Sequence, residues 1–85
     1  MRSFTYTIVE PRGIHVRSAG ILAEMVRPLN STVIIRKGDA QAGAKQLVAV
    51  MGLNIKQGEE ILVMVEGSDE IADCAKVEKF FKKYF

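Results

Sequence analysis

Apolar and polar residues alternate strictly near the start of the chain. Phe4, Tyr6 and Ile8 are separated by Ser3, Thr5 and Thr7. A period of two predicts a β-strand with one buried face. The strand is followed by Pro11-Arg12-Gly13, a combination typical of a loop. Beyond the loop the spacing becomes helical, at Ala19, Leu22, Ala23 and Val26. This pattern predicts an amphipathic helix that ends near Pro28.

The middle of the chain predicts a hairpin and a short helix. Residues 32–36 are rich in β-branched side chains and predict a second strand. Lys37-Gly38-Asp39 is a hairpin signal, so residues 40–44 are expected to return as a weaker third strand. Residues 46–53 carry apolar side chains at helical spacing and predict a short helix, although Val48 and Gly52 weaken the pattern.

The last third of the chain predicts one more strand and one more helix. Residues 60–65 form a strand with apolar side chains on both faces. Ser68 is expected to cap the final helix, with Asp69 and Glu70 in its first turn. Its predicted inner face consists of Ile71, Cys74, Val77 and Phe81. The order β-α-β-β-α-β-α favours an α+β fold, with helices packed on one face of an antiparallel sheet.

Composition narrows the possible functions. Eighty-five residues fit one domain spanning residues 1–85, and 48% hydrophobic with 26% charged residues is typical of a folded globular chain. A net charge of +2 is too small to indicate nucleic acid binding. Several lysines near the C-terminus suggest RNA at first sight, but no aromatic platform accompanies them, so a solvated helix face is the better interpretation. These are Lys76, Lys79, Lys82 and Lys83.

A single cysteine and a single histidine limit the chemistry further. Cys74 alone excludes an intramolecular disulfide and a multi-thiolate zinc site, so we expect no metal, no cofactor and a reduced, cytoplasmic setting. Neither a secretory signal nor the roughly 20 apolar residues of a membrane span is present, so no membrane insertion is expected.

One segment has the character of a reactive site. It runs over residues 13–20 and places His15 just ahead of the first predicted helix. The backbone N–H groups of Val16, Arg17 and Ser18 would then lie at a helix N-terminus, which binds anions such as phosphate. Arg17 adds a permanent cation, and a neutral imidazole is a competent nucleophile near physiological pH. By itself, a His-x-Arg before a helix is usually an ordinary surface pair.

The whole chain resembles HPr, the histidine-containing phosphocarrier family of the phosphoenolpyruvate-dependent sugar phosphotransferase system. The family motif Gly-Leu-His-Ala-Arg-Pro-Ala corresponds to Gly-Ile-His-Val-Arg-Ser-Ala at residues 13–19, and a second family segment matches residues 44–58. The resemblance implies an open-faced β-sandwich of four antiparallel strands and three helices. It also implies that enzyme I phosphorylates His15 at Nδ1, that the group passes to sugar-specific IIA domains, and that the chain is a monomeric carrier and not an enzyme.

Three positions depart from the family pattern. Ser18 replaces a proline, which should loosen the first helical turn and add an N–H, with a hydroxyl as a further candidate phosphate contact. Gln46 occupies the position of a regulatory serine and has no hydroxyl to phosphorylate. Val16 replaces an alanine at the rim of the site.

Partner docking is the last expectation from the resemblance. The first helix and the short helix would carry it through Gly20, Arg27, Leu47, Val48 and Met51. Two interpretations stay open for Leu47, Val48 and Met51, an exposed apolar patch or part of the core, and Arg27 is equally well a plain surface charge. Two other functions remain as well: a regulatory binding module without phosphate relay, and a nitrogen-related paralogue with its own enzyme I.

Overall fold

A computed structural model describes residues 1–85. The elements follow the predicted order, with boundaries within two residues of those expected. The strands are β1 (Arg2–Thr7), β2 (Ser31–Lys37), β3 (Ala40–Gly43) and β4 (Glu60–Gly67), and the helices are α1 (Val16–Val26), α2 (Leu47–Gly52) and α3 (Glu70–Tyr84). The α+β class, the four-stranded sheet and the three helices are thereby confirmed.

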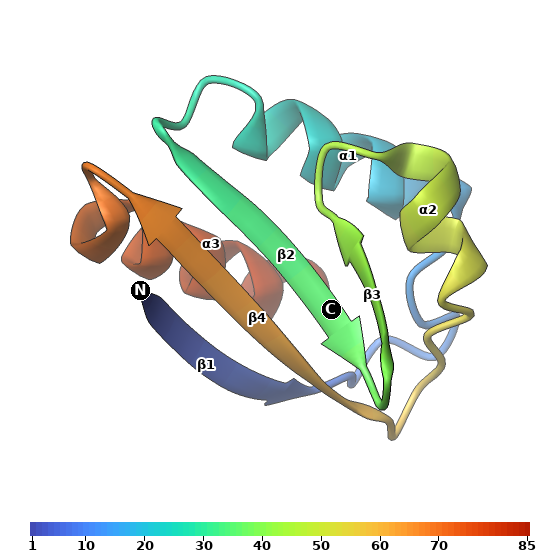
Figure 1. Cartoon of the computed structure of the whole chain (residues 1–85). Coiled ribbons are helices and arrows are strands. Elements are labelled where there is room, and N and C mark those ends of the chain that lie inside the picture. Colours follow the sequence, from blue (N-terminus) through green and yellow to red (C-terminus); the bar gives the residue numbers. More distant parts are fainter.

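The strands form one sheet in the order β1-β4-β2-β3, and every neighbouring pair is antiparallel. The last strand in the chain thus lies inside the sheet, between the first and the second. Residues Ile61, Val63 and Val65 of β4 alternate with less buried ones and face the helices. In Figure 1 α3 lies behind the sheet, whereas α1 and α2 lie toward the upper right, and the near face of the sheet carries no helix, so the architecture is an open-faced sandwich.

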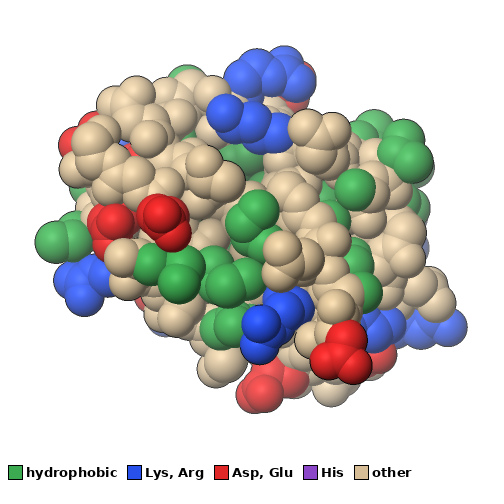
Figure 2. Space-filling model, in the orientation of Figure 1, with side chains coloured by type: hydrophobic (Ala, Val, Ile, Leu, Met, Phe, Trp, Pro, Cys, Tyr) green, Lys and Arg blue, Asp and Glu red, His purple; other side chains and the backbone are tan.

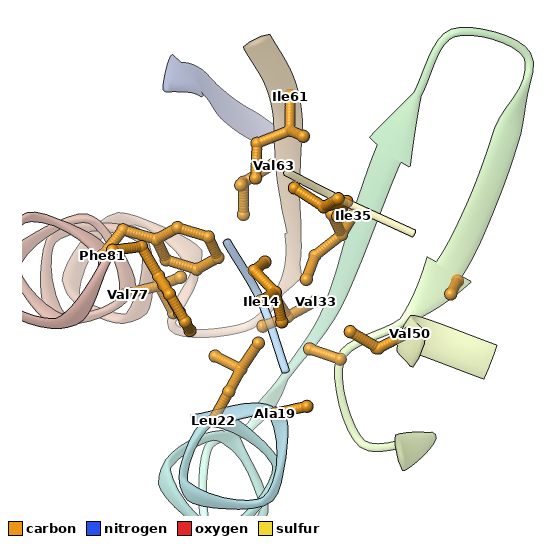
Figure 3. Close-up of a cluster of buried hydrophobic side chains, with 14 of the residues drawn as sticks. Ile14, Ala19, Leu22, Val33, Ile35, Val50, Ile61, Val63, Val77 and Phe81 are labelled. Carbon is orange, nitrogen blue, oxygen red and sulfur yellow. The ribbon is translucent and has the colours of Figure 1, made fainter. Parts of the chain in front are cut away.

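The core fills the space between the sheet and the helices (Figure 3). It takes Ala19 and Leu22 from α1, Val50 from α2, and Val77 and Phe81 from α3. The Phe81 ring is fully buried and meets Phe4 and Tyr6 of β1 edge to face, at centroid distances of 5.8 and 5.9 Å. This contact fixes α3 behind β1 and β4, because aromatic rings contribute large buried areas with preferred geometry. All four residues predicted for the inner face of α1 are buried.

The start of α3 differs from the sequence prediction in two respects. Ser68 is not the cap: Asp69 occupies the N-cap position and makes no side-chain cap hydrogen bond. Ile71 is 67% exposed and not part of the inner face. At 100° per residue, Ile71 lies about 120° around the helix from Val77, whereas Asp73 lies only about 40° away. Asp73 is consequently buried, and its carboxylate accepts a hydrogen bond of 2.7 Å from the Ser31 hydroxyl.

Cys74 packs partly buried against the core, as predicted. This burial raises the pKa of its thiol, because the charged thiolate is poorly solvated there. None of the three helices combines the length and the apolar character that crossing a membrane requires.

The other face of the sheet is uncovered. Figure 2 views this face in the orientation of Figure 1, with apolar side chains near its centre and charged ones around them. A cavity of about 410 Å³ lies on it, lined by residues that include Thr32, Ile34 and Met64. No histidine is visible on this face, so the chemistry predicted for His15 lies elsewhere on the molecule.

Candidate functional site

The loop between β1 and α1 is held against the segment that follows α2. In Figure 1 the blue loop after β1 runs beside the yellow segment before β4. The Ile14 N–H donates to the Ile55 carbonyl at 3.1 Å. Gly13 has a φ of +62°, and a Cβ there would overlap the Ile55 carbonyl oxygen and lie 2.8 Å from the Cα of Lys56. Position 13 therefore requires glycine both for its backbone conformation and for space.

The supporting segment is itself clamped by a lysine from β2. Lys37 Nζ donates to the Asn54 carbonyl at 2.8 Å and pairs with Glu59 Oε1 at 3.0 Å. Glu59 also accepts the Lys56 N–H at 2.7 Å. The hydrogen bond from Lys37, followed by that from Lys56, lowers the pKa of Glu59 below its ordinary value. The resulting stabilisation is present above that ordinary pKa and is lost as the pH falls through the lowered value.

His15 occupies the N-cap position of α1. Its backbone is extended, with φ −119° and ψ 177°, and its carbonyl accepts the Ala19 N–H at 2.8 Å as the first intrahelical hydrogen bond. The N–H groups of Val16, Arg17 and Ser18 consequently precede the helical ladder and have no intrahelical acceptor. The His15 side chain faces the backbone N–H of Ser18 in a capping-box arrangement but accepts no hydrogen bond from it. The imidazole thus stands at the positive end of the helix.

Ser18 makes two hydrogen bonds that the sequence did not predict. Its hydroxyl is buried against the backbone of His15: it accepts the His15 N–H at 3.1 Å and donates to the His15 carbonyl at 3.1 Å. Both hydrogen bonds join the hydroxyl to the helix cap, and its contact with a phosphoryl group stays a prediction. A proline at this position would lack these bonds, so the serine fixes the first turn by hydrogen bonding instead of by ring rigidity.

An open cavity of about 270 Å³ adjoins the imidazole. Its lining contains the predicted His15, Arg17 and Ser18 and four residues that sequence reasoning did not assign. The four are Glu10, Arg12, Ile21 and Tyr84. Glu10 and Arg12 lie within five residues of His15 in the sequence, so this proximity was a local signal that both charged side chains border the site. Tyr84 comes from the far end of the chain and could not.

The predicted docking residues divide into two kinds. Val48 of α2 is 84% exposed. Val16, which was predicted at the rim of the site and not for docking, is 62% exposed. Leu47 and Met51 are partly buried and pack against the core. Of the two interpretations of the short helix, the exposed patch is therefore correct for Val48, and partial core packing is correct for the other two residues.

The other two predicted docking residues are Gly20 in α1 and Arg27, which directly follows α1. Gly20 is partly exposed, and a Cβ there would meet no atom within 4 Å. The exposed Arg27 pairs with Glu24 at 2.7 Å. No three His, Cys, Asp or Glu side chains come together as metal ligands.

Comparison with known proteins places this geometry in a family. The family model described as "PTS HPr component phosphorylation site" matches residues 2–83. A phosphocarrier protein HPr from Lysinibacillus sphaericus is 37% identical over 70 residues, which cover 82% of this chain and 80% of the relative. A multiphosphoryl transfer protein from Xanthomonas campestris pv. campestris is 39% identical over 66 residues, covering 78% of this chain and 8% of that much longer protein.

The fold agrees with the same family. The crystal structure of HPr-C-His from Thermoanaerobacter tengcongensis superposes with a TM-score of 0.89 at 23% identity, covering 96% of this chain and 92% of that one. At this identity the likeness concerns the fold alone. The family match over residues 2–83, the agreement in fold and the histidine at the N-terminus of α1 lead to one conclusion: this chain belongs to the HPr phosphocarrier family of the phosphotransferase system.

Proposed function

We propose that His15 accepts a phosphoryl group from enzyme I, originally from phosphoenolpyruvate, and passes it to the IIA domains of sugar permeases. The observation that carries the proposal is the position of the only histidine, which occupies the N-cap position of α1 and lines one cavity with Arg17. The chain acts as a carrier and not as an enzyme, because the phosphoryl group is bound to it only in transit. Residues 1–85 act as one carrier unit in the cytoplasm and need no cofactor for this chemistry.

The reaction is a displacement at phosphorus. Neutral Nδ1 of His15 donates its lone pair to the phosphorus while the bond from phosphorus to the donor nitrogen or oxygen breaks, and the leaving atom keeps that electron pair. Such transfers depend mainly on positioning and on electrostatic stabilisation. The free N–H groups of Val16 and Arg17 and the Arg17 guanidinium supply positive charge to the phosphoryl oxygens. The return step to an acceptor uses the same contacts in reverse.

The proposal is tested by incubation with enzyme I and labelled phosphoenolpyruvate, followed by a chase with a IIA domain. His15→Ala should take up no label. Arg17→Ala should keep the nucleophile but transfer the group about tenfold more slowly or slower still, which corresponds to a loss of at least about 1.4 kcal/mol of transition-state stabilisation. Arg36→Ala is the matched control, because Arg36 is an exposed arginine of β2 outside the cavity.

The chemical form of the label gives a second criterion. A phosphohistidine is a phosphoramidate, labile in acid and stable in base, whereas a phosphoserine is stable in acid. Label that persists in His15→Ala, or an acid-stable adduct, would contradict the proposal. Label that forms on His15 but does not move to any IIA domain would favour a regulatory binding module over a relay.

A further inference from the structure

Two charged side chains in the His15 cavity have no role in the chemistry described so far. Arg12 and Glu10 line it together with Arg17. Arg17 lies in the helical turn after the histidine, whereas Arg12 and Glu10 lie in the loop before it. The cavity is therefore bordered by charges on both sides of the imidazole.

Backbone hydrogen bonds hold the loop that carries Glu10 and Arg12 in one conformation. The Gly13 N–H donates to the Glu10 carbonyl at 2.8 Å, which closes a tight turn over residues 10–13, and the Arg12 N–H donates to Glu10 Oε1 at 3.3 Å. The turn is held at both ends. The Glu10 N–H donates to the Phe85 carbonyl at 2.8 Å, and Gly13 packs against Ile55. Arg12 is thus presented to the cavity by a supported turn, even though its side chain is exposed.

Arg12 and Glu10 carry opposite charges and would therefore interact in opposite ways with a phosphoryl group in the cavity. A phosphoryl group carries up to about two negative charges, and one guanidinium leaves part of that charge unbalanced. A second guanidinium can bind the remaining oxygens in the planar, two-pronged geometry that arginine favours. The Glu10 carboxylate has the opposite sign and repels the same oxygens.

We propose that Arg12 is a second phosphoryl-binding residue, and that Glu10 opposes it and keeps the phosphoryl group from binding too firmly to be passed on. This inference rests on the proposed function of His15. The pair would balance loading against release, since a carrier must both accept and surrender the group. Arg12 and Glu10 should therefore affect phosphorylation in opposite directions.

The test uses a small donor, so that docking to a partner protein plays no part. Phosphoramidate transfers its phosphoryl group to imidazole: the new bond joins phosphorus to the ring nitrogen, the bond to the donor nitrogen breaks, and ammonia leaves with that electron pair. Arg12→Gln should be phosphorylated on the order of fivefold more slowly than the unmodified chain, because it loses a positive charge beside the phosphoryl group. The factor is modest because solvent in the open cavity partly screens that charge. Glu10→Gln should be faster by about twofold or more, and Arg12→Lys should recover part of the rate.

The controls separate a charge effect from a structural one. Arg36→Gln removes an exposed arginine outside the cavity and should leave the rate unchanged. A disturbed turn would slow phosphorylation of both Arg12→Gln and Glu10→Gln. A charge effect would slow Arg12→Gln and speed Glu10→Gln, and both changes in rate would become smaller at high salt. If folded Arg12→Gln matches Arg36→Gln, or if the two cavity variants shift in the same direction, the inference is wrong. If the unmodified chain takes up no label on His15, the proposed function fails and the inference falls with it.

Discussion

Gly13 shows most directly how one residue sets the geometry of the site. Its left-handed backbone would tolerate a side chain only at a cost, and the Ile55 carbonyl leaves no space for one. The same close approach brings the Ile14 N–H to Ile55 and so sets the position of His15, the next residue. The two backbones can come into contact only because residue 13 has no Cβ, so the requirement for glycine is steric as well as conformational.

We predict that Gly13→Ala destabilises the fold by about 3 kcal/mol or more and slows phosphorylation of His15. Gly38→Ala is the matched control, because Gly38 has a φ of +59° but a Cβ added there would meet no atom within 4 Å. That variant should lose only about 1–2 kcal/mol, the cost of the left-handed backbone alone. Urea unfolding measures both free energies. Equal losses in the two variants would show that the contact with Ile55 is not limiting.

Gln46 determines a second property at the residue scale. It is exposed at the N-cap of α2 and has no hydroxyl. We predict that HPr kinase and ATP leave this chain unmodified at position 46, and that Gln46→Ser becomes a substrate if the kinase recognises the surrounding surface. Mass spectrometry after incubation reads both outcomes, with Gln46→Ala as the control. Stoichiometric phosphate on a serine or threonine elsewhere in the chain would show that the kinase acts at a different position, since Leu47–Gly52 of α2 contains no hydroxyl side chain.

At the scale of elements, one side of α2 packs into the core and the other side is exposed to solvent. It contributes the fully buried Val50 to the core, while Val48 projects into solvent two residues earlier. Leu47 and Met51 lie between these extremes. Six residues are too few to form a stable helix alone, so contact with α1 and β3 must hold α2 in place.

We predict that Val48→Glu weakens binding to enzyme I by about tenfold while the fold is retained, since a charge replaces exposed apolar area at the proposed docking surface. Calorimetry measures the affinity, and circular dichroism checks the fold. Leu47→Glu and Met51→Glu are poorer tests, because both side chains also pack against the core. Ile71→Glu is the control, an equally conspicuous exposed apolar residue on α3. Unchanged affinity of folded Val48→Glu would remove Val48 from the docking surface.

At the scale of the whole molecule, the sheet order makes the fold depend on contacts between distant parts of the chain. The strand β4 pairs with both β1 and β2, and α3 then packs behind β1 and β4. One polar contact supports this arrangement from within: the Ser31 hydroxyl at the start of β2 donates to the buried carboxylate of Asp73 in α3. A carboxylate at such a position needs a partner, because burial without one is costly.

We predict that Ser31→Ala lowers the free energy of unfolding by about 1–3 kcal/mol, because it leaves Asp73 buried without that donor. Ser68→Ala should change it by less than about 0.5 kcal/mol, since Ser68 is exposed and is not the cap of α3. Urea denaturation at neutral pH gives both values. A double-mutant cycle with Asp73→Asn isolates the pair. A costly Ser68→Ala would restore that residue as a cap, and a neutral Ser31→Ala would show that the buried bond contributes little.

The sequence by itself determined the order and type of the elements, and it indicated His15 and Arg17 as the proposed reactive pair. Alternation in residues 3–8 and helical spacing after Ala19 follow from backbone geometry, which repeats locally and needs no distant contact. His15 and Arg17 were predicted because a short motif lies just ahead of a helix, which is also a local arrangement. The match of that motif and of residues 44–58 to the HPr pattern made the family identifiable.

Tertiary structure alone decided what depends on chain segments that meet only after folding. The phase of α3 was set by packing of Val77 and Phe81 against the sheet, which buried Asp73 and left Ile71 exposed. Tyr84 reached the His15 cavity from the other end of the chain. The Ser18 hydroxyl was committed to the backbone of His15, a choice among several acceptors that its sequence position left open. In each case the deciding energy is a packing or hydrogen-bond contact whose partner is fixed by three-dimensional proximity, and residue type alone does not specify it.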